Sequence, residues 1–189
     1  MAQFYDHITD EIKDFIRKQP LFFVATAPLN ADGHVNLSPK GMDSFRILGD
    51  NSVGYIDMTG SGNETSAHIA ENGRITFMFC GFENKADIIR LYGTGRVVLP
   101  DAPEWDTLSG HFPALISARQ LIIADVHKAQ SSCGYAVPYM EFKGERDTLS
   151  KYWQVKGEDA LPEYWENKNV TSIDGLTTPL GDALQNADD

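Results

Sequence analysis

The chain has 189 residues, of which 42% are hydrophobic and 11% aromatic, so it can bury a core of its own and is expected to form one domain with appendages. A formal net charge of −11 and an isoelectric point near 4.8 argue against binding to nucleic acid or to an anionic membrane surface. We therefore expect its partners to be small molecules or another protein chain.

The two cysteines, Cys80 and Cys133, are far apart in the sequence and indicate neither a disulfide framework nor a zinc site. The first eleven residues contain acidic side chains and no long apolar run, and no stretch reaches transmembrane length. These features predict a soluble, cytoplasmic protein.

The first half of the chain reads as one helix followed by short strands. Residues 9–18 are amphipathic, with Thr9 placed to cap them, and Pro20 ends the predicted helix. Strands are predicted at residues 21–27, 34–38, 45–48 and 53–57. The first two are separated by turn residues and should form a hairpin.

The next part of the chain adds longer strands. Residues 74–82 and 88–99 are apolar and are predicted to pair antiparallel, with Gly93 and Gly95 marking a bulge or a sharp bend. A helix start follows at residues 101–104, and residues 120–127 form another predicted strand. Many short strands with few helices between them favour a mainly β, antiparallel barrel over a parallel doubly wound sheet.

The character of the sequence changes after residue 141. Residues 145–155 form a predicted amphipathic helix, followed by an aromatic and charged stretch and an acidic tail. These residues hold too few apolar side chains for a second core. We therefore divide the chain into a barrel domain, residues 1–142, and a C-terminal helical arm, residues 143–189, that packs on the barrel or on a partner subunit.

The stretch at residues 53–72, VGYIDMTGSGNETSAHIAEN, is the strongest local feature. A strand that enters a helix through a glycine loop presents unpaired main-chain amides and the positive end of the helix dipole, an arrangement that suits a phosphate. The alternative is purely structural: Gly60 and Gly62 make the turn and Asn63 caps the helix.

Motifs for other enzyme classes are missing from the sequence. It contains no GxSxG, HExxH, P-loop or CxxC pattern, and its five histidines are scattered. Lys40, between a proline and a glycine at a strand end, is either held near the barrel mouth or a solvated surface lysine. Because small and aromatic residues dominate the predicted mouth, the chemistry is expected to come from a bound cofactor.

Several motifs resemble the pyridoxamine 5'-phosphate oxidase-like family of FMN-binding split barrels. They are VNLSPKG at 35–41, FRIL at 45–48, YIDMTGSGNET at 55–65, NGRITFMFCGFE at 72–83 and RLYGTGRVVLP at 90–100, with SSCGYAVP, GERD and SIDGL beyond them. The resemblance implies an antiparallel six-stranded Greek-key split β-barrel with peripheral helices. It also implies a homodimer that binds two flavins between its subunits.

The resemblance also implies a set of cofactor-binding residues. Ser38, Pro39 and Lys40 correspond to the edge of the flavin ring, Asp57, Met58 and Thr59 to the ribityl chain, and Gly60, Ser61, Gly62, Asn63 and Thr65 to the phosphate loop. Arg46 corresponds to a phosphate-binding arginine. The family's Ser-Arg-Lys at the helix start is replaced here by Asn63-Glu64-Thr65, which removes positive charge from the phosphate site.

The function implied is an FMN-dependent oxidoreductase with a small-molecule substrate and NADH or NADPH as candidate electron donors. The alternatives are a non-catalytic flavin- or haem-binding protein and a deazaflavin-dependent reductase. The arginine and histidine that bind substrate in the oxidase find no match in TSIDGLTTPLGD, so oxidation of vitamin B6 is not expected. The residues suggest no metal site, and they leave the catalytic side chains unidentified.

Overall fold

The computed structural model describes residues 2–83 and 85–187. The strands are β1 (Gln3–Tyr5), β2 (Phe22–Thr26), β3 (Asn36–Lys40), β4 (Phe45–Ile47), β5 (Ser52–Met58), β6 (Arg74–Cys80), β7 (Asp87–Val98) and β8 (Ala118–Cys133). The helices are α1 (Asp10–Ile16), α2 (Glu64–Asn72), α3 (Trp105–Ser109), α4 (Thr148–Lys156), α5 (Leu161–Lys168) and α6 (Pro179–Ala187). A 3-10 turn, Glu158–Ala160, joins α4 to α5.

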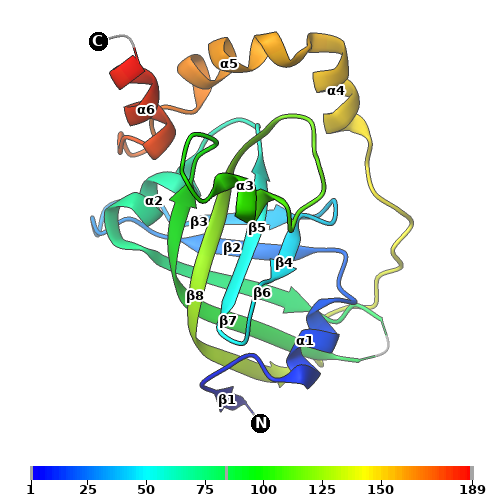
Figure 1. The fold of residues 1–189 in the computed structure, drawn as a ribbon. Coiled ribbons are helices and arrows are strands. Elements are labelled where there is room, and N and C mark those ends of the chain that lie inside the picture. The colour runs from blue at the N-terminus through cyan, green and yellow to red at the C-terminus, as the bar shows by residue number, and fades with distance from the viewer. Residues whose placement is uncertain (1, 84, 188–189) are drawn as a thin grey trace.

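All strands pair antiparallel in one curled sheet of order β3-β2-β6-β7-β8-β5-β4, and β1 pairs with β8 (Figure 1). β6, β7 and β8 follow one another, and β8 returns beside β5, which is a Greek-key arrangement. The predicted antiparallel split barrel with peripheral helices is confirmed. Six strands have five or more residues, whereas β1 and β4 have three each.

Most predicted elements are present, with shifted ends. Thr9 caps α1 by accepting from the Ile12 amide, and α2 ends at Gly73 with φ of 72°, a left-handed conformation that favours glycine. The bulge predicted near Gly93 is confirmed by a register shift between Tyr92 and Gly93. Several details of the prediction were wrong. β1 and the helix α6 in the acidic tail were not expected, β3 begins two residues later, and α3 begins at Trp105. The strand predicted at residues 120–127 is the longer β8.

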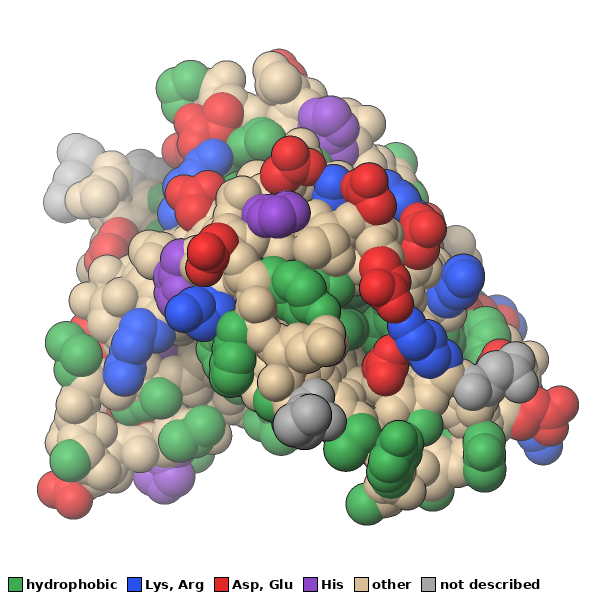
Figure 2. Space-filling model, turned by 90° about the horizontal axis from the view of Figure 1, so that it is seen from below, with side chains coloured by type: hydrophobic (Ala, Val, Ile, Leu, Met, Phe, Trp, Pro, Cys, Tyr) green, Lys and Arg blue, Asp and Glu red, His purple; other side chains and the backbone are tan. Residues whose placement is uncertain are grey.

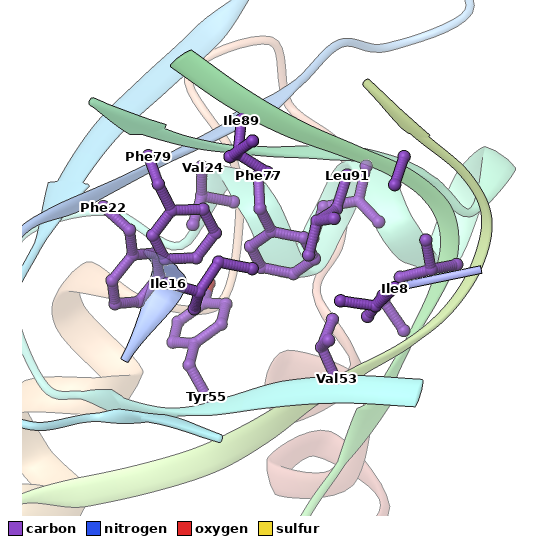
Figure 3. Packing of buried hydrophobic residues seen from close by; sticks show 14 of the residues in the cluster. Ile8, Ile16, Phe22, Val24, Val53, Tyr55, Phe77, Phe79, Ile89 and Leu91 are labelled. Atoms are coloured by element: carbon purple, nitrogen blue, oxygen red, sulfur yellow. The ribbon is translucent and has the colours of Figure 1, made fainter. Parts of the chain in front are cut away.

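The barrel core is aromatic where β2, β5 and β6 face one another (Figure 3). The Phe22 and Phe79 rings stack at a centroid distance of 5.7 Å, and Tyr55 meets Phe22 edge-on at the same distance. Ile16 of α1 lies beside these rings, and Ile8, just before α1, lies near Val53 and Leu91 in the same buried cluster, so α1 covers the lower end of the barrel. Burial of such side chains is the main stabilisation of a barrel of this size.

The C-terminal helices α4, α5 and α6 lie above the upper end of the barrel (Figure 1). Residues 134–147 form no helix or strand and connect β8 to α4 along the outside of the molecule. The division at residues 142 and 143 stays a prediction. None of the helices in the described part of the chain combines the length and hydrophobicity needed to cross a bilayer.

Candidate functional site at the start of α2

The junction of β5 and α2 has the strand–glycine–helix form expected from the sequence. β5 ends at Met58, residues 59–63 form the glycine loop, and α2 begins at Glu64. Gly62 has φ of 78°, so this position requires a residue that tolerates the left-handed conformation. Asn63 does not cap α2 with its side chain, contrary to the structural alternative. Its Oδ1 instead accepts from Gln120 Nε2 at 2.8 Å, because β8 lies beside the loop.

Asp57, at the end of β5, is a buried carboxylate with three cationic or amide donors around it. Arg119 contacts its Oδ2 through Nε at 2.9 Å and Nη2 at 2.8 Å, Gln120 Nε2 donates to the same oxygen at 2.9 Å, and Lys40 Nζ donates to Oδ1 at 2.9 Å. Burial alone raises the pKa of Asp57, but the charges of Arg119 and Lys40 outweigh burial and hold that pKa well below its ordinary value. The carboxylate therefore stays ionised, and the cluster of two cations and one anion carries a surplus positive charge.

β3 contributes polar side chains on the face that looks toward this junction. Lys40 reaches Asp57, Asn36 Nδ2 donates to Thr65 Oγ1 at 2.9 Å, and Ser38 Oγ donates to Asn36 Oδ1 at 3.1 Å. β3 and the β4–β5 pair are the two ends of the sheet order, so the contact of Lys40 with Asp57 crosses the split of the barrel, and Asn36 links β3 to α2. Pro39 alternates to the opposite, exposed face.

The C-terminal arm packs on the glycine loop. Two indole N–H groups donate to Thr59: Trp153 Nε1 to its carbonyl oxygen at 3.3 Å and Trp165 Nε1 to its hydroxyl at 2.8 Å. Asn169, which follows α5, donates from Nδ2 to the carbonyl oxygens of Gly60 at 2.9 Å and Gly62 at 3.3 Å. The arm is therefore part of the junction rather than a separate appendage.

Several polar groups at the junction have no protein partner. Within residues 2–83 and 85–187, the main-chain amides of Gly60 to Ser66 make no hydrogen bond. Ser117 Oγ and Asn169 Oδ1 are buried and likewise unpartnered. Ser117 also has φ of 70°, a strained value for a residue other than glycine, and its carbonyl oxygen accepts from the Thr59 amide and hydroxyl. Free amides suit an anion, and isolated acceptors suit hydroxyl groups.

Comparison with known proteins places the chain in a family. The family model described as pyridoxamine 5'-phosphate oxidase matches residues 8–133. A curated protein of that family, ustO of Aspergillus flavus, is 38% identical over 198 residues, which cover 93% of this chain and 77% of that protein. The chain belongs to the pyridoxamine 5'-phosphate oxidase family. The resemblance identified from the sequence motifs is therefore confirmed.

Solved structures agree in fold. The H111A variant of HupZ from Group A Streptococcus is 27% identical and has a TM-score of 0.53, with 66% of this chain and 99% of that chain covered. A protein of Lactobacillus delbrueckii is 14% identical, with a TM-score of 0.52 and coverage of 66% and 94%, and it shows the fold alone. Both alignments cover about two thirds of this oxidase-family chain.

Most of the residues predicted to bind a cofactor in this oxidase-family protein meet at the junction. Ser38, Lys40, Asp57, Thr59, Asn63 and Thr65 make the contacts described above, and Gly60 and Gly62 supply loop carbonyls. Ser61 is the exposed tip of the same loop. Met58, which pairs with Ala118 on β8, is half-buried, and Pro39 faces away.

Arg46 is placed elsewhere. It lies on β4 opposite Gly54, and its guanidinium forms a two-pronged ion pair with Asp43, with both nitrogen–oxygen distances at 2.9 Å. It also donates to the carbonyl oxygen of His111 at 2.9 Å. Nothing in the described residues connects it to the glycine loop, and its predicted phosphate role stays untested. Near the loop, the structure instead places the buried Arg119 and the half-buried Lys40, both paired with Asp57.

Arg119, Gln120 and the arm residues were missed by the sequence analysis. Asp57 and Gln120 are register partners across β5 and β8, so only the strand pairing brings them together. One signal was available: Arg119 and Gln120 directly precede the apolar run LIIADV, and a charged residue at a buried strand start requires a partner. For Asn169, within the polar run ENKN, no sequence signal distinguished it from its neighbours.

Two cavities lie near α1, on the side shown in Figure 2. One of about 750 Å³ is lined by residues that include Phe15, Phe82 and Phe142, and one of about 550 Å³ includes Arg46. Figure 2 shows acidic and basic side chains interspersed around hydrophobic ones on this side. None of the glycine-loop residues lines either cavity.

Proposed function

We propose that this protein is an FMN-binding oxidoreductase that holds its cofactor at the junction of β5 and α2. The observation that carries the proposal is the set of unbonded amides from Gly60 to Ser66 beside the unpartnered, buried Ser117 Oγ and Asn169 Oδ1. FMN offers a phosphate and a chain of hydroxyl groups, which match these donors and acceptors. Membership of the pyridoxamine 5'-phosphate oxidase family supports the same choice.

Different residues of the junction bind different parts of FMN. The loop amides and the start of α2 hold the phosphate, and the surplus positive charge of the Lys40, Arg119 and Asp57 cluster favours an anion nearby. Ser117 and Asn169 accept from hydroxyl groups of the ribityl chain. When bound, the flavin supplies hydride transfer, and the protein supplies position, hydrogen bonds and exclusion of water. The substrate is a small molecule that replaces the pyridoxine phosphate of the oxidase.

The proposal includes a homodimer. Leu37 lies on the edge strand β3 and is 61% exposed, and Val35, just before β3, is 73% exposed. Tyr139, in the segment between β8 and α4, is 88% exposed. Exposed apolar side chains on an edge strand are typical of a surface that another chain covers. Sedimentation at micromolar concentration tests this part, and a monomer alone contradicts it.

The visible spectrum of the purified protein is the first test of the proposed function. Bound FMN gives the absorption of an oxidised flavin, and anaerobic addition of NADH or NADPH should bleach it if the protein is a reductase. A bound flavin that dithionite reduces, but that neither NADH nor NADPH reduces, supports a binding protein. A haem or deazaflavin spectrum, or failure to bind added FMN, contradicts the proposal.

A further inference from the structure

The arm contacts the glycine loop mainly by donating hydrogen bonds to the carbonyl oxygens of the loop. Trp153 Nε1 donates to the Thr59 carbonyl, and Asn169 Nδ2 donates to those of Gly60 and Gly62. Arg119 Nη1 donates to the Gly62 carbonyl from the barrel side at 2.9 Å. Three of the four carbonyls from Thr59 to Gly62 are thus held by side-chain donors.

A held carbonyl also fixes the amide that follows it. The peptide unit is planar and trans, so its N–H points opposite to its C=O. Fixing the carbonyls of Gly60 and Gly62 therefore turns the amides of Ser61 and Asn63 away from Asn169. These amides are among those that have no acceptor in the described residues. The amides of Ser61 and Asn63, with one residue between them, are therefore both available to an anion on the side away from Asn169.

Asn169 is itself firmly held. It has no solvent exposure, and its carbonyl oxygen accepts from Thr178 Oγ1 at 2.8 Å and from Asn63 Nδ2 at 3.2 Å. Its amide donates to the Trp165 carbonyl at 2.8 Å. The side chain thus reaches the loop from a backbone that is anchored on three sides.

We propose that Asn169 is a positioning residue that orients the loop amides toward a bound phosphate. It acts through the carbonyls of Gly60 and Gly62 and need not touch the phosphate. The inference rests on the proposed function in one respect, because the phosphate is taken to be that of FMN. It assigns to the C-terminal arm a part in selecting phosphorylated over unphosphorylated ligands.

Titration of FMN and riboflavin into Asn169→Ala, Asn169→Asp and wild type tests the proposal. The two ligands share the ring and the ribityl chain, so only the phosphate distinguishes them. Loss of an oriented amide bond to a charged group should weaken FMN by about 10- to 100-fold in Asn169→Ala. Riboflavin should lose less, because it forfeits only the neutral hydrogen bond to Asn169 Oδ1 that the two ligands share. Asn169→Asp keeps an acceptor for the ribityl chain, replaces the donor and adds a negative charge, so riboflavin should keep its affinity while FMN loses at least as much as in Asn169→Ala.

Asn167→Ala is the matched control. Asn167 lies two residues earlier and is exposed, and within the described residues its side chain bonds only to the Glu163 carbonyl. It should leave both affinities unchanged. Equal losses of FMN and riboflavin affinity in Asn169→Ala would overturn the inference, because Asn169 would then only stabilise the arm. No loss of either affinity would also overturn it, because Asn169 would then have no effect on binding.

Inorganic phosphate separates this inference from the proposed function. Added to isotope-labelled wild type, it should shift the amide resonances of residues 60–66, and Asn169→Ala should remove that shift. If wild type binds no flavin but shows the phosphate shifts, the proposed function fails and the inference stands. If phosphate leaves these amides unchanged in wild type, the inference fails whatever the flavin does.

Discussion

The two ends of the barrel differ in a way that bears on how a site is recognised. The α1 end has the volume: cavities of about 750 and 550 Å³, both within the range of ligand pockets. Its ion pairs are exposed, as with Lys85 and Glu11, whose side chains are 55% and 80% exposed. The opposite end, where β5 enters α2, lines neither cavity but buries Asp57 and Arg119, whose side chains are 3% and 6% exposed.

Unsatisfied buried polar groups, rather than empty volume, distinguish the proposed site from the α1 end. Buried polar groups are normally hydrogen-bonded, so unpartnered ones at Ser117 and Asn169 require an explanation. The cavities and ion pairs at the α1 end need no such explanation, since apolar volume and exposed charges are ordinary features of a protein surface. Four predictions sharpen this contrast.

The largest effect is expected from removal of Arg119. Arg119→Met leaves the buried Asp57 with Lys40 and Gln120 only, and loss of one partner from a buried ion pair costs about 3–5 kcal/mol of unfolding free energy. Arg46→Met, which breaks the Asp43 pair with side chains 29% and 79% exposed, should cost about 1 kcal/mol or less. Urea unfolding of both variants measures the difference, and equal losses would show that burial does not separate the two pairs.

Substitution of Gly62 tests the loop. A valine at φ of 78° is strained by about 1–2 kcal/mol, and its branched side chain also blocks close approach to the loop. We expect Gly62→Val to lower the affinity for FMN strongly while it lowers the free energy of unfolding only by this strain. Gly60→Ala is the control for stability, because a Cβ there meets nothing within 4 Å and the melting temperature should not change. A large drop in melting temperature with normal flavin binding by the folded fraction would make the loop structural only.

Much of the fold could be predicted because it depends on local patterns. The apolar alternation of β6 and β7, the glycines at their bulge and the glycine that ends α2 each act within a few residues. β1 was missed because its three residues are polar or exposed and pair only with the end of β8. Its existence depends on a partner strand more than a hundred residues away.

The candidate site was predictable in part for the same reason. The strand, loop and helix of the junction are contiguous, so the loop residues were found from the sequence. Arg119 and Asn169 reach the loop from β8 and from the arm, and only the register of β5 with β8 and the docking of α5 bring them there. Arg46 was chosen from the family pattern; it lies on β4 opposite Gly54 and its guanidinium pairs with Asp43, so its phosphate role stays a prediction.

Glu64 provides a smaller effect. Its carboxylate accepts from the Ile173 amide at 3.1 Å and lies in the first turn of α2, beside the proposed phosphate site. Glu64→Gln keeps an acceptor and removes the charge, so FMN should bind about 2- to 5-fold more tightly while riboflavin stays unchanged. Glu64→Arg should tighten FMN further. Isothermal titration with both ligands measures this, and a gain for riboflavin equal to that for FMN would exclude a phosphate effect.

The smallest effect concerns the contact between the β2–β3 hairpin and the arm. His34 Nδ1 lies 2.7 Å from Asp174 Oδ1, and the His34 amide donates to Oδ2 at 2.8 Å. The hydrogen bond to Asp174, followed by its charge, raises the pKa of His34 above its ordinary value of 6.5. The protonated ring therefore stabilises the folded arm below pH 6.5, and this contribution is lost as the pH rises through the folded-state pKa.

Asp174→Asn separates this contact from its surroundings. The variant keeps the size of the side chain and removes its charge, so the pKa of His34, followed by nuclear magnetic resonance, should fall toward 6.5. Asp182→Asn, an exposed acid on α6 of the same arm, should leave that pKa where it is. Because the His34 side chain is 70% exposed, the stability change should be small, as for other surface pairs. A His34 pKa that is the same in wild type and Asp174→Asn would mean that the contact does not hold the arm to the hairpin in solution.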